Sequence, residues 1–314
     1  MRPPGGLPYV DSCRNDCTPT EGIEPWPHLR EFEFVRVVWT CNASSYTGLE
    51  RITAMGDVTD LLTEANEQIM NADNKERLQR LLGTYERILE RDPSNYEALW
   101  SLGRYNVVMV LGYTESRSEK EKHNLAAINY CEQAMNTNPE FKALSTGGGS
   151  ERVGDACRFL SKREIAPLYY WYAGMGSYWK ECLPFPRRIR NMHFAVALRK
   201  VMIRMLEIDP TWAGGHPYYA WGFYYINIPR IMGGSLKKAE EFIDKAVEAG
   251  PKWLYARWGR AKYLYTRKKD KEAFREDMEW VIAQDARRMD SPYPANVHFQ
   301  RDAKAMLSHI DDYF

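Results

Sequence analysis

The sequence of 314 residues lacks long apolar runs and has almost no net charge. No stretch approaches the ~18 to 20 consecutive apolar residues that a helix needs to cross a bilayer, so no membrane-spanning helix is predicted. Lys and Arg number 43 against 42 Asp and Glu, which gives a formal charge of +1 and a sequence pI of 7.6. Nucleic-acid-binding domains usually have a pI above ~9, so we expect no nucleic-acid partner.

Catalytic and metal-binding motifs are also missing from the sequence. The six histidines are dispersed, and no two stand three or four residues apart, the spacing that places two metal ligands on one helix face. The glycine-rich residues 147–150 lack the Lys-Ser/Thr of a phosphate-binding loop, and residues 174–178 lack the second flanking glycine of a nucleophile elbow. We therefore predict a non-enzymatic protein with no cofactor and no metal.

Cysteine is sparse, and half of the six cysteines lie near the N-terminus, where little core is available to shelter them. In an oxidising compartment Cys13, Cys17 and Cys41 are candidates for a disulfide clip. A zinc site is disfavoured because the Cys-x2-Cys pair of common structural sites is absent. Residues 1–8 show no apolar stretch typical of a secretory signal, so we expect either a cytoplasmic protein or one whose signal has been removed.

Residues 1–50 are rich in Pro, Gly, Ser and Thr and lack helical periodicity, so we interpret them as an extended N-terminal arm. Within the arm, residues 31–41 alternate polar and apolar side chains, a pattern that predicts one β-strand. A lone strand must pair with something, so either the arm folds back on its own helices or the strand is donated to a neighbouring chain. The candidate assembly residues of the strand are Phe32, Phe34, Val37 and Trp39.

Residues 51–314 show helical rather than strand periodicity. Four amphipathic stripes end at a proline, and each is followed by another helical segment, which predicts an array of helical hairpins. Residues 92–106 resemble the start of a tetratricopeptide repeat, but the prolines are spaced more widely than the ~34 residues of an undecorated repeat. We predict an all-α, tetratricopeptide-like solenoid of about four degenerate repeats, closed by a capping helix at 295–313. The four prolines are Pro93, Pro139, Pro210 and Pro251.

Aromatic residues gather in three windows, 168–182, 212–225 and 253–265. These windows are the first helices of successive hairpins, which line the concave face of a tetratricopeptide stack. Trp and Tyr at that face would form a groove with an apolar body and polar tips. The alternative is that most of these rings form core between repeats. The candidate groove residues are Tyr169, Trp171, Tyr172, His216, Tyr219, Trp221 and Tyr224.

A proline, two Gly-Gly pairs and an Ala-x-x-Phe helix follow the Tyr/Trp-rich residues 167–173. With this arrangement, the region from residue 166 to the C-terminus resembles the T component (TatT-like) of tripartite ATP-independent periplasmic (TRAP) transporters, a family of cryptic tetratricopeptide proteins. The second Gly-Gly pair precedes an expected helix at 235–248 with Ser235 as its cap, where positive φ is useful. The motif positions are Gly214, Gly215, Pro229, Gly233, Gly234, Ala239 and Phe242.

The resemblance implies a periplasmic or otherwise extracytoplasmic scaffold without enzymatic activity. It implies a homo-oligomer, expected to be a trimer, that docks a periplasmic substrate-binding protein and handles an apolar or amphipathic small molecule. The N-terminal arm is not part of the resemblance, and neither Cys13 nor Cys17 lies in a lipobox, although family members are typically lipoproteins.

The sequence is also compatible with two other functions. A general tetratricopeptide adaptor would clamp a peptide carboxylate near Arg199, Arg257 or Arg260. A structural subunit of an assembly would donate residues 30–41 to the next protomer.

Overall fold

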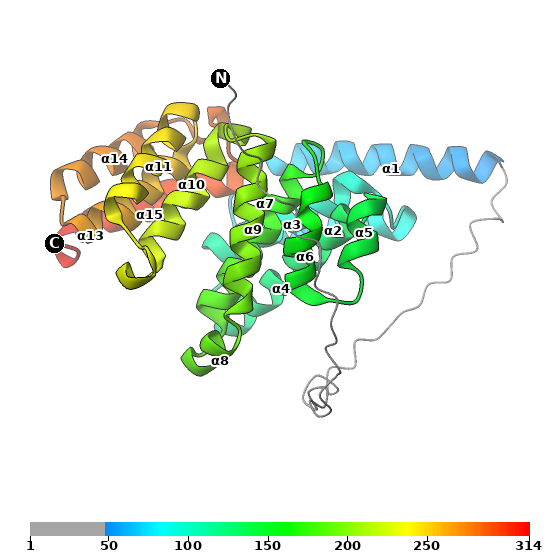
Figure 1. The fold of residues 1–314 in the computed structure, drawn as a ribbon. Helices are drawn as coiled ribbons and strands as arrows, with labels where there is room; N and C mark the ends of the chain where they lie inside the picture. Colours follow the sequence, from blue (N-terminus) through cyan, green and yellow to red (C-terminus); the bar gives the residue numbers. More distant parts are fainter. Residues whose placement is uncertain (1–47) are drawn as a thin grey trace, which may run out of the picture. The chain divides into compact units, whose positions relative to one another are not determined.

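A computed structural model describes residues 48–314 of the chain, and it describes side chains from residue 57 onward, residue 232 excepted. This region consists of helices and contains no strand, which confirms the predicted all-α class (Figure 1). The predicted N-terminal strand and disulfide clip lie outside the described residues. The residues concerned are Cys13, Cys17, Phe32, Phe34, Val37, Trp39 and Cys41.

The first four helices pack one against the next in chain order. Side chains of Asn74, Asn95 and Ser116 cap three of them by accepting hydrogen bonds from backbone N–H groups of the first turn. The helix before Pro93 ends at Arg91, as the sequence predicts. The four helices are α1 (Gly48–Ile69), α2 (Lys75–Arg91), α3 (Tyr96–Gly112) and α4 (Arg117–Met135).

The middle of the chain adds a long hairpin, α7 and α9, whose first helix packs against both α3 and α4. Shorter helices fill the connections, and α6 packs against α9. The elements are α5 (Pro139–Ser145), α6 (Gly149–Ala156), η2 (Cys157–Phe159), α7 (Ile165–Ser177), η3 (Tyr178–Cys182), α8 (Phe185–Arg190) and α9 (His193–Ile208).

The last part of the chain forms two further hairpins, α10 with α11 and α12 with α14, followed by the C-terminal helix α15. The elements are α10 (Trp212–Asn227), η4 (Arg230–Met232), α11 (Leu236–Ala249), α12 (Leu254–Gly259), η5 (Arg260–Tyr265), α13 (Thr266–Lys268), α14 (Lys271–Ala283), η6 (Ala286–Arg288), α15 (Tyr293–Ser308) and η7 (Ile310–Asp312).

The first Gly-Gly motif explains how α10 lies so close to α11. Gly214 and Gly215 have φ angles of 83° and 84°, in the left-handed region that favours glycine. A Cβ atom on Gly215 would lie 2.9 Å from the Cα atom of Ala246 in α11, closer than packed atoms approach. The motif therefore serves helix packing within this hairpin.

The second Gly-Gly motif shapes the turn before α11. Gly233 has a φ angle of 97°, in the left-handed region, whereas the φ angle of Gly234 lies outside that region. The Ser235 side chain accepts a hydrogen bond from the Lys238 N–H, so Ser235 caps α11 as predicted. Of the other motif positions, Ala239 is fully buried and the Phe242 ring stacks on Trp221, while Pro229 precedes η4.

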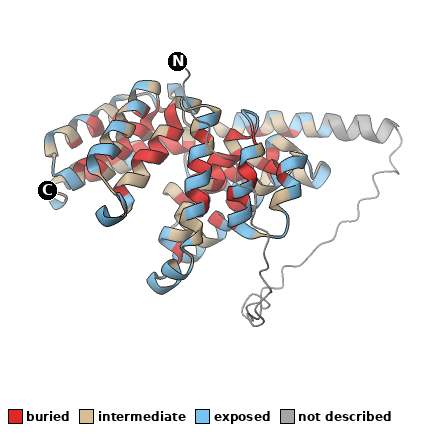
Figure 2. Cartoon of the chain, viewed as in Figure 1, coloured by how far each residue is buried: buried red, intermediate tan, exposed pale blue. Residues whose placement is uncertain are grey.

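The C-terminal helix α15 closes the array by contacting α3, which lies near the N-terminal end of the array. It packs against α12 and α14, as a capping helix should, and also against α3. The Tyr113 hydroxyl donates to the Pro294 carbonyl at 2.7 Å, and Arg301 Nη2 donates to the Gly112 carbonyl at 2.8 Å. Figure 2 shows the buried residues concentrated on the helix faces that meet one another. The first helices of the hairpins therefore surround a common interior.

Candidate functional site

A cavity of about 290 Å³ lies where α3, α4, α7, α10 and α12 converge. Four of these helices are the first members of their hairpins, so the inner helices of the array build most of its wall. Aliphatic side chains from α3 and aromatic rings from α7, α10, α12 and η5 provide an apolar lining. The rings that line the cavity are Tyr169, Tyr172, Tyr219, Phe223, Tyr255, Trp258 and Tyr263.

The aromatic rings of the wall contact one another across helix boundaries. The Tyr219 and Tyr255 ring centres are 4.6 Å apart, and those of Phe223 and Tyr263 are 5.2 Å apart. Burial raises the pKa of Tyr255 to about 12 and raises the pKa of Tyr169 as well, so these phenols are neutral at physiological pH. The wall therefore offers flat apolar surfaces and uncharged hydroxyls.

Three lysines and one glutamate supply the charged part of the lining. Lys120 Nζ pairs with Glu181 Oε2 at 2.7 Å, and Lys262 Nζ pairs with an Asp302 carboxylate oxygen at 2.9 Å. Two of the three ammonium groups are thus neutralised by a carboxylate.

The third ammonium group, that of Lys180, has a different environment. Its Nζ donates to the amide oxygen of Asn227 at 3.1 Å and lies 4.9 Å from the centre of the Phe223 ring. No carboxylate within the described part of the chain forms an ion pair with it. Desolvation lowers the pKa of Lys180, and the charge of the neighbouring Glu181 carboxylate opposes that shift. The cavity therefore has one cation that an anionic ligand would neutralise.

Two π-helical turns carry three of the four charged residues of the lining. α7 continues into the π-helical η3, which holds Lys180 and Glu181, and α12 continues into the π-helical η5, which holds Lys262 and Tyr263. A π-turn inserts one residue into a helix and shifts the register of the side chains that follow, and such turns are frequent at functional sites.

The structure divides the groove residues proposed from the sequence into two sets. Tyr169, Tyr172 and Tyr219 line the cavity, whereas Trp171, His216, Trp221 and Tyr224 do not. The latter four lie in packing positions behind or beside the wall.

The indoles behind the wall are fixed by hydrogen bonds. Trp171 Nε1 donates to Glu132 Oε1 at 2.8 Å, and Trp221 Nε1 donates to the Met202 carbonyl at 3.3 Å. Trp221 is buried with its ring 5.5 Å from that of Tyr224. These residues position the inner helices rather than offering a surface to a ligand.

Sequence reasoning passed over several residues of the lining. Tyr255 and Trp258 lie in the third aromatic window, and the aromatic clustering of that window is the sequence feature that could have identified them. Phe223 lies within the second window. The cavity lysines at 120, 180 and 262 show no pattern in the sequence that distinguishes them from surface lysines.

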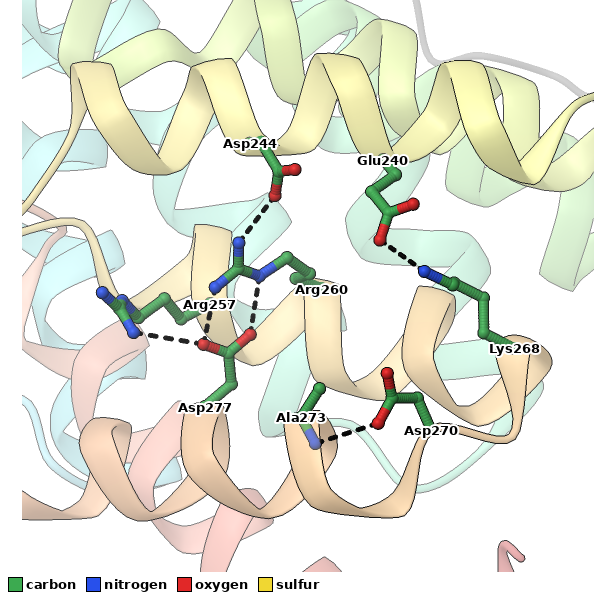
Figure 3. Close-up of polar contacts among 8 residues, drawn as sticks. All are labelled: Glu240, Asp244, Arg257, Arg260, Lys268, Asp270, Ala273 and Asp277. Carbon is green, nitrogen blue, oxygen red and sulfur yellow. Dashed lines mark hydrogen bonds and ion pairs between the residues drawn. The ribbon is translucent and has the colours of Figure 1, made fainter.

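Two arginines considered as peptide clamps are engaged elsewhere. Asp277 on α14 is buried and accepts from Arg260 Nε at 2.7 Å and from Arg257 Nη1 at 3.2 Å (Figure 3). Arg260 Nη1 also pairs with Asp244 of α11 at 2.6 Å. Arg257 and Arg260 thus tie three helices together, while Arg199 is exposed on α9.

The described residues hold no group of three or more His, Cys, Asp or Glu side chains arranged to bind a metal ion. The three cysteines in this part, Cys131, Cys157 and Cys182, are buried free thiols. Among the described helices, none combines the length and the apolar character needed to span a membrane.

The described residues form an all-helical hairpin array around an aromatic cavity, and comparison with known families shows which family has this sequence. The family model of the TRAP transporter T-component matches residues 75–314, and the chain belongs to that family. The matched span contains every residue that lines the cavity. Among curated proteins, none matches the chain. Family membership supports a role for this chain in a TRAP transport system.

Proposed function

We propose that this chain is a non-enzymatic scaffold of a TRAP-type system whose cavity binds an amphipathic organic anion. The observation that carries the proposal is the cavity of about 290 Å³, with its aromatic wall and the ammonium group of Lys180. Its volume is near the lower end of the ~300 to 1,000 Å³ typical of small-molecule sites. A ligand with an apolar body and one anionic group matches both the rings and the Lys180 ammonium group, which forms no ion pair within the described residues.

Docking of a periplasmic substrate-binding protein is the second part of the proposal. Family membership supports it, together with an extracytoplasmic location and a homo-oligomer, for which we propose a trimer. Light scattering of the chain alone and mixed with the binding protein of the same system tests this part. A chain that is monomeric and forms no complex contradicts it.

The two alternative functions have less support. A peptide-clamping adaptor needs free guanidinium groups, but Arg257 and Arg260 are paired with buried Asp277. A strand-donating assembly subunit depends on residues 30–41, which lie outside the described residues.

Replacing Lys180 with Gln tests the charge of the proposed ligand. Two fluorescent probes of similar shape serve as ligands, the anionic anilinonaphthalene sulfonate and the neutral N-phenylnaphthylamine. We expect K180Q to weaken binding of the anionic probe about tenfold, because a charged hydrogen bond contributes ~1.5 kcal/mol or more, and to leave the neutral probe unaffected.

Lys237→Gln is the matched control, because Lys237 is an exposed lysine on α11 that does not line the cavity. K237Q should bind both probes as the wild type does. If K180Q weakens the binding of both probes equally, or weakens the binding of neither, the cavity does not select an anion.

A further inference from the structure

Three of the four most exposed large apolar side chains of the described region lie at two hairpin turns, and the fourth is Val196 of α9. Phe185 and Ile189 of α8, between α7 and α9, are 70% and 56% exposed. Ile231 of η4, between α10 and α11, is 96% exposed. In Figure 2, α8 is drawn almost entirely in the colour of exposed residues. Isolated exposed apolar residues are common, but a cluster of this kind marks an interaction surface.

The same turns carry positive charge without negative charge. Residues 183–206 include no Asp or Glu, and α8 contributes Arg187, Arg188 and Arg190. Within the described part of the chain, none of these three arginines forms an ion pair with a carboxylate; Arg188 Nε donates instead to the Leu183 carbonyl at 2.8 Å. Arg230 of η4 is exposed and likewise without an ion pair there. Exposed apolar and cationic side chains therefore occur together at both turns.

Contacts between helix ends place the two turns on one edge of the array. Lys180, just before α8, donates to Asn227 at the end of α10. Arg267, in the corresponding turn of the next hairpin, donates to the Ile226 carbonyl. In Figure 1, α8 and the turn between α10 and α11 project on the same side of the helices.

We propose that this turn edge binds peripherally to a membrane surface rich in anionic lipid. Apolar side chains that enter the headgroup region and cations that meet lipid phosphates reinforce each other, and neither set alone gives stable attachment. The turn edge consists of Phe185, Arg187, Arg188, Ile189, Arg190, Arg230 and Ile231.

A lipid surface fits these residues better than other occupants do. A second copy of the chain placed symmetrically on the turn edge would bring arginines against arginines, which is repulsive. An acidic protein would satisfy the arginines, but Phe185 of α8 and Ile231 of η4 belong to two different turns, each of which also carries a cation. Separate apolar projections flanked by cations suit insertion between headgroups. This inference is independent of the cavity and its ligand.

Sedimentation of the full chain with lipid vesicles tests the proposal. One set of vesicles is phosphatidylcholine alone, and the other is an equal mixture of phosphatidylcholine and phosphatidylglycerol. We expect the chain to sediment with the mixed vesicles only and to be released by high salt. Arg187→Gln with Arg190→Gln should lower the partition coefficient about thirtyfold, because each cation near an anionic surface contributes ~1 kcal/mol. Phe185→Ser with Ile231→Ser should lower it at least about tenfold.

Matched controls change side chains of the same types elsewhere. Met70→Ser with Leu125→Ser removes exposed apolar groups, and Arg80→Gln with Lys304→Gln removes exposed cations. Both control variants should sediment as the wild type does, and thermal unfolding should show that all four variants are folded. Failure of the wild type to bind mixed vesicles, or binding that survives either set of turn-edge substitutions, overturns the proposal. An interaction found only with an acidic protein would do the same.

Discussion

A buried histidine illustrates how the aromatic residues of this protein are used. The His216 ring stacks on Trp253 with ring centres 3.8 Å apart, and the rings of Tyr169 and Trp212 lie at 4.6 Å and 5.3 Å. Because burial removes the imidazole from water, it lowers the pKa of His216 to about 3. His216 is therefore neutral in the folded protein at any physiological pH and acts as part of the packing behind the cavity wall.

Acidification should destabilise the protein through this residue. In the unfolded chain His216 has a pKa near ~6.5, so the unfolded state takes up a proton that the folded state rejects, and stability falls as the pH drops below ~6.5 towards 3. At pH 5 the cost is on the order of 2 kcal/mol. His216→Phe keeps a ring and removes the titration, so its free energy of unfolding should fall less steeply between pH 7 and pH 5.

Urea unfolding at several pH values measures this difference. The comparison with H216F is needed because burial also lowers the pKa of His298, to about 4, and His298 contributes in the same direction. Parallel pH profiles for the wild type and H216F would show that folding does not shift the pKa of His216.

Which aromatic residues line the cavity was not predictable from spacing alone. α7 is buried on all sides, and its consecutive residues Tyr169, Tyr170 and Trp171 are all buried. Because the helix has no polar face, the sequence does not show which of its side chains point toward the cavity. The cavity lysines are hidden for a different reason. Lys180 and Lys262 lie in π-helical turns, and the shift in register cannot be recognised from a regular helical repeat.

At the scale of elements, the sequence was far more informative. Prolines and capping residues act locally, so the ends of the helices before Pro93 and Pro251 and the Ser235 cap were all predictable. The ion-pair cluster that joins α11, α12 and α14 was not, because it depends on which helices become neighbours (Figure 3).

Removal of the buried carboxylate in that cluster should destabilise the last hairpin strongly. The Asp277 side chain is 2% exposed and neutralises Arg260, which is itself largely buried. Asp277→Ala leaves that guanidinium without its main partner, and we expect a loss of ~3 to 5 kcal/mol in the free energy of unfolding.

Asp244→Ala provides the matched comparison, because Asp244 pairs with the same arginine but is 45% exposed. An exposed ion pair contributes ~1 kcal/mol or less, so D244A should have a small effect. Urea denaturation of both variants measures the contrast. Similar losses for the two would show that burial does not govern this cluster.

At the scale of the whole molecule, the closure of the hairpin array creates the cavity. α15 contacts α3, although the two are separated by most of the described chain, and the inner helices face a shared interior as a result. The sequence predicted a capping helix at the C-terminus, and α15 confirms it. The contact with α3 could not be predicted, because superhelical closure depends on the angles between successive hairpins, which the loops set. Membership of the TRAP transporter T-component family then assigns this architecture to a transport system.

The central claim is that this interior cavity is the binding site for an organic ligand. Gly176 lines the cavity, and a Cβ atom added there would lie more than 4 Å from the atoms of the surrounding elements, so Gly176→Leu can begin a side chain toward this space without a clash at its Cβ atom. Gly83 of α2 is equally unobstructed but does not line the cavity, so Gly83→Leu is the matched control. Both changes replace a helical glycine and should leave the fold at least as stable.

Titration of the three proteins with anilinonaphthalene sulfonate is the most direct test. We expect a saturable site with one probe per chain in the wild type and in G83L, and a loss of at least about tenfold in affinity in G176L, because a filled cavity excludes the probe. Unchanged saturable binding by G176L would show that the probe binds outside the cavity.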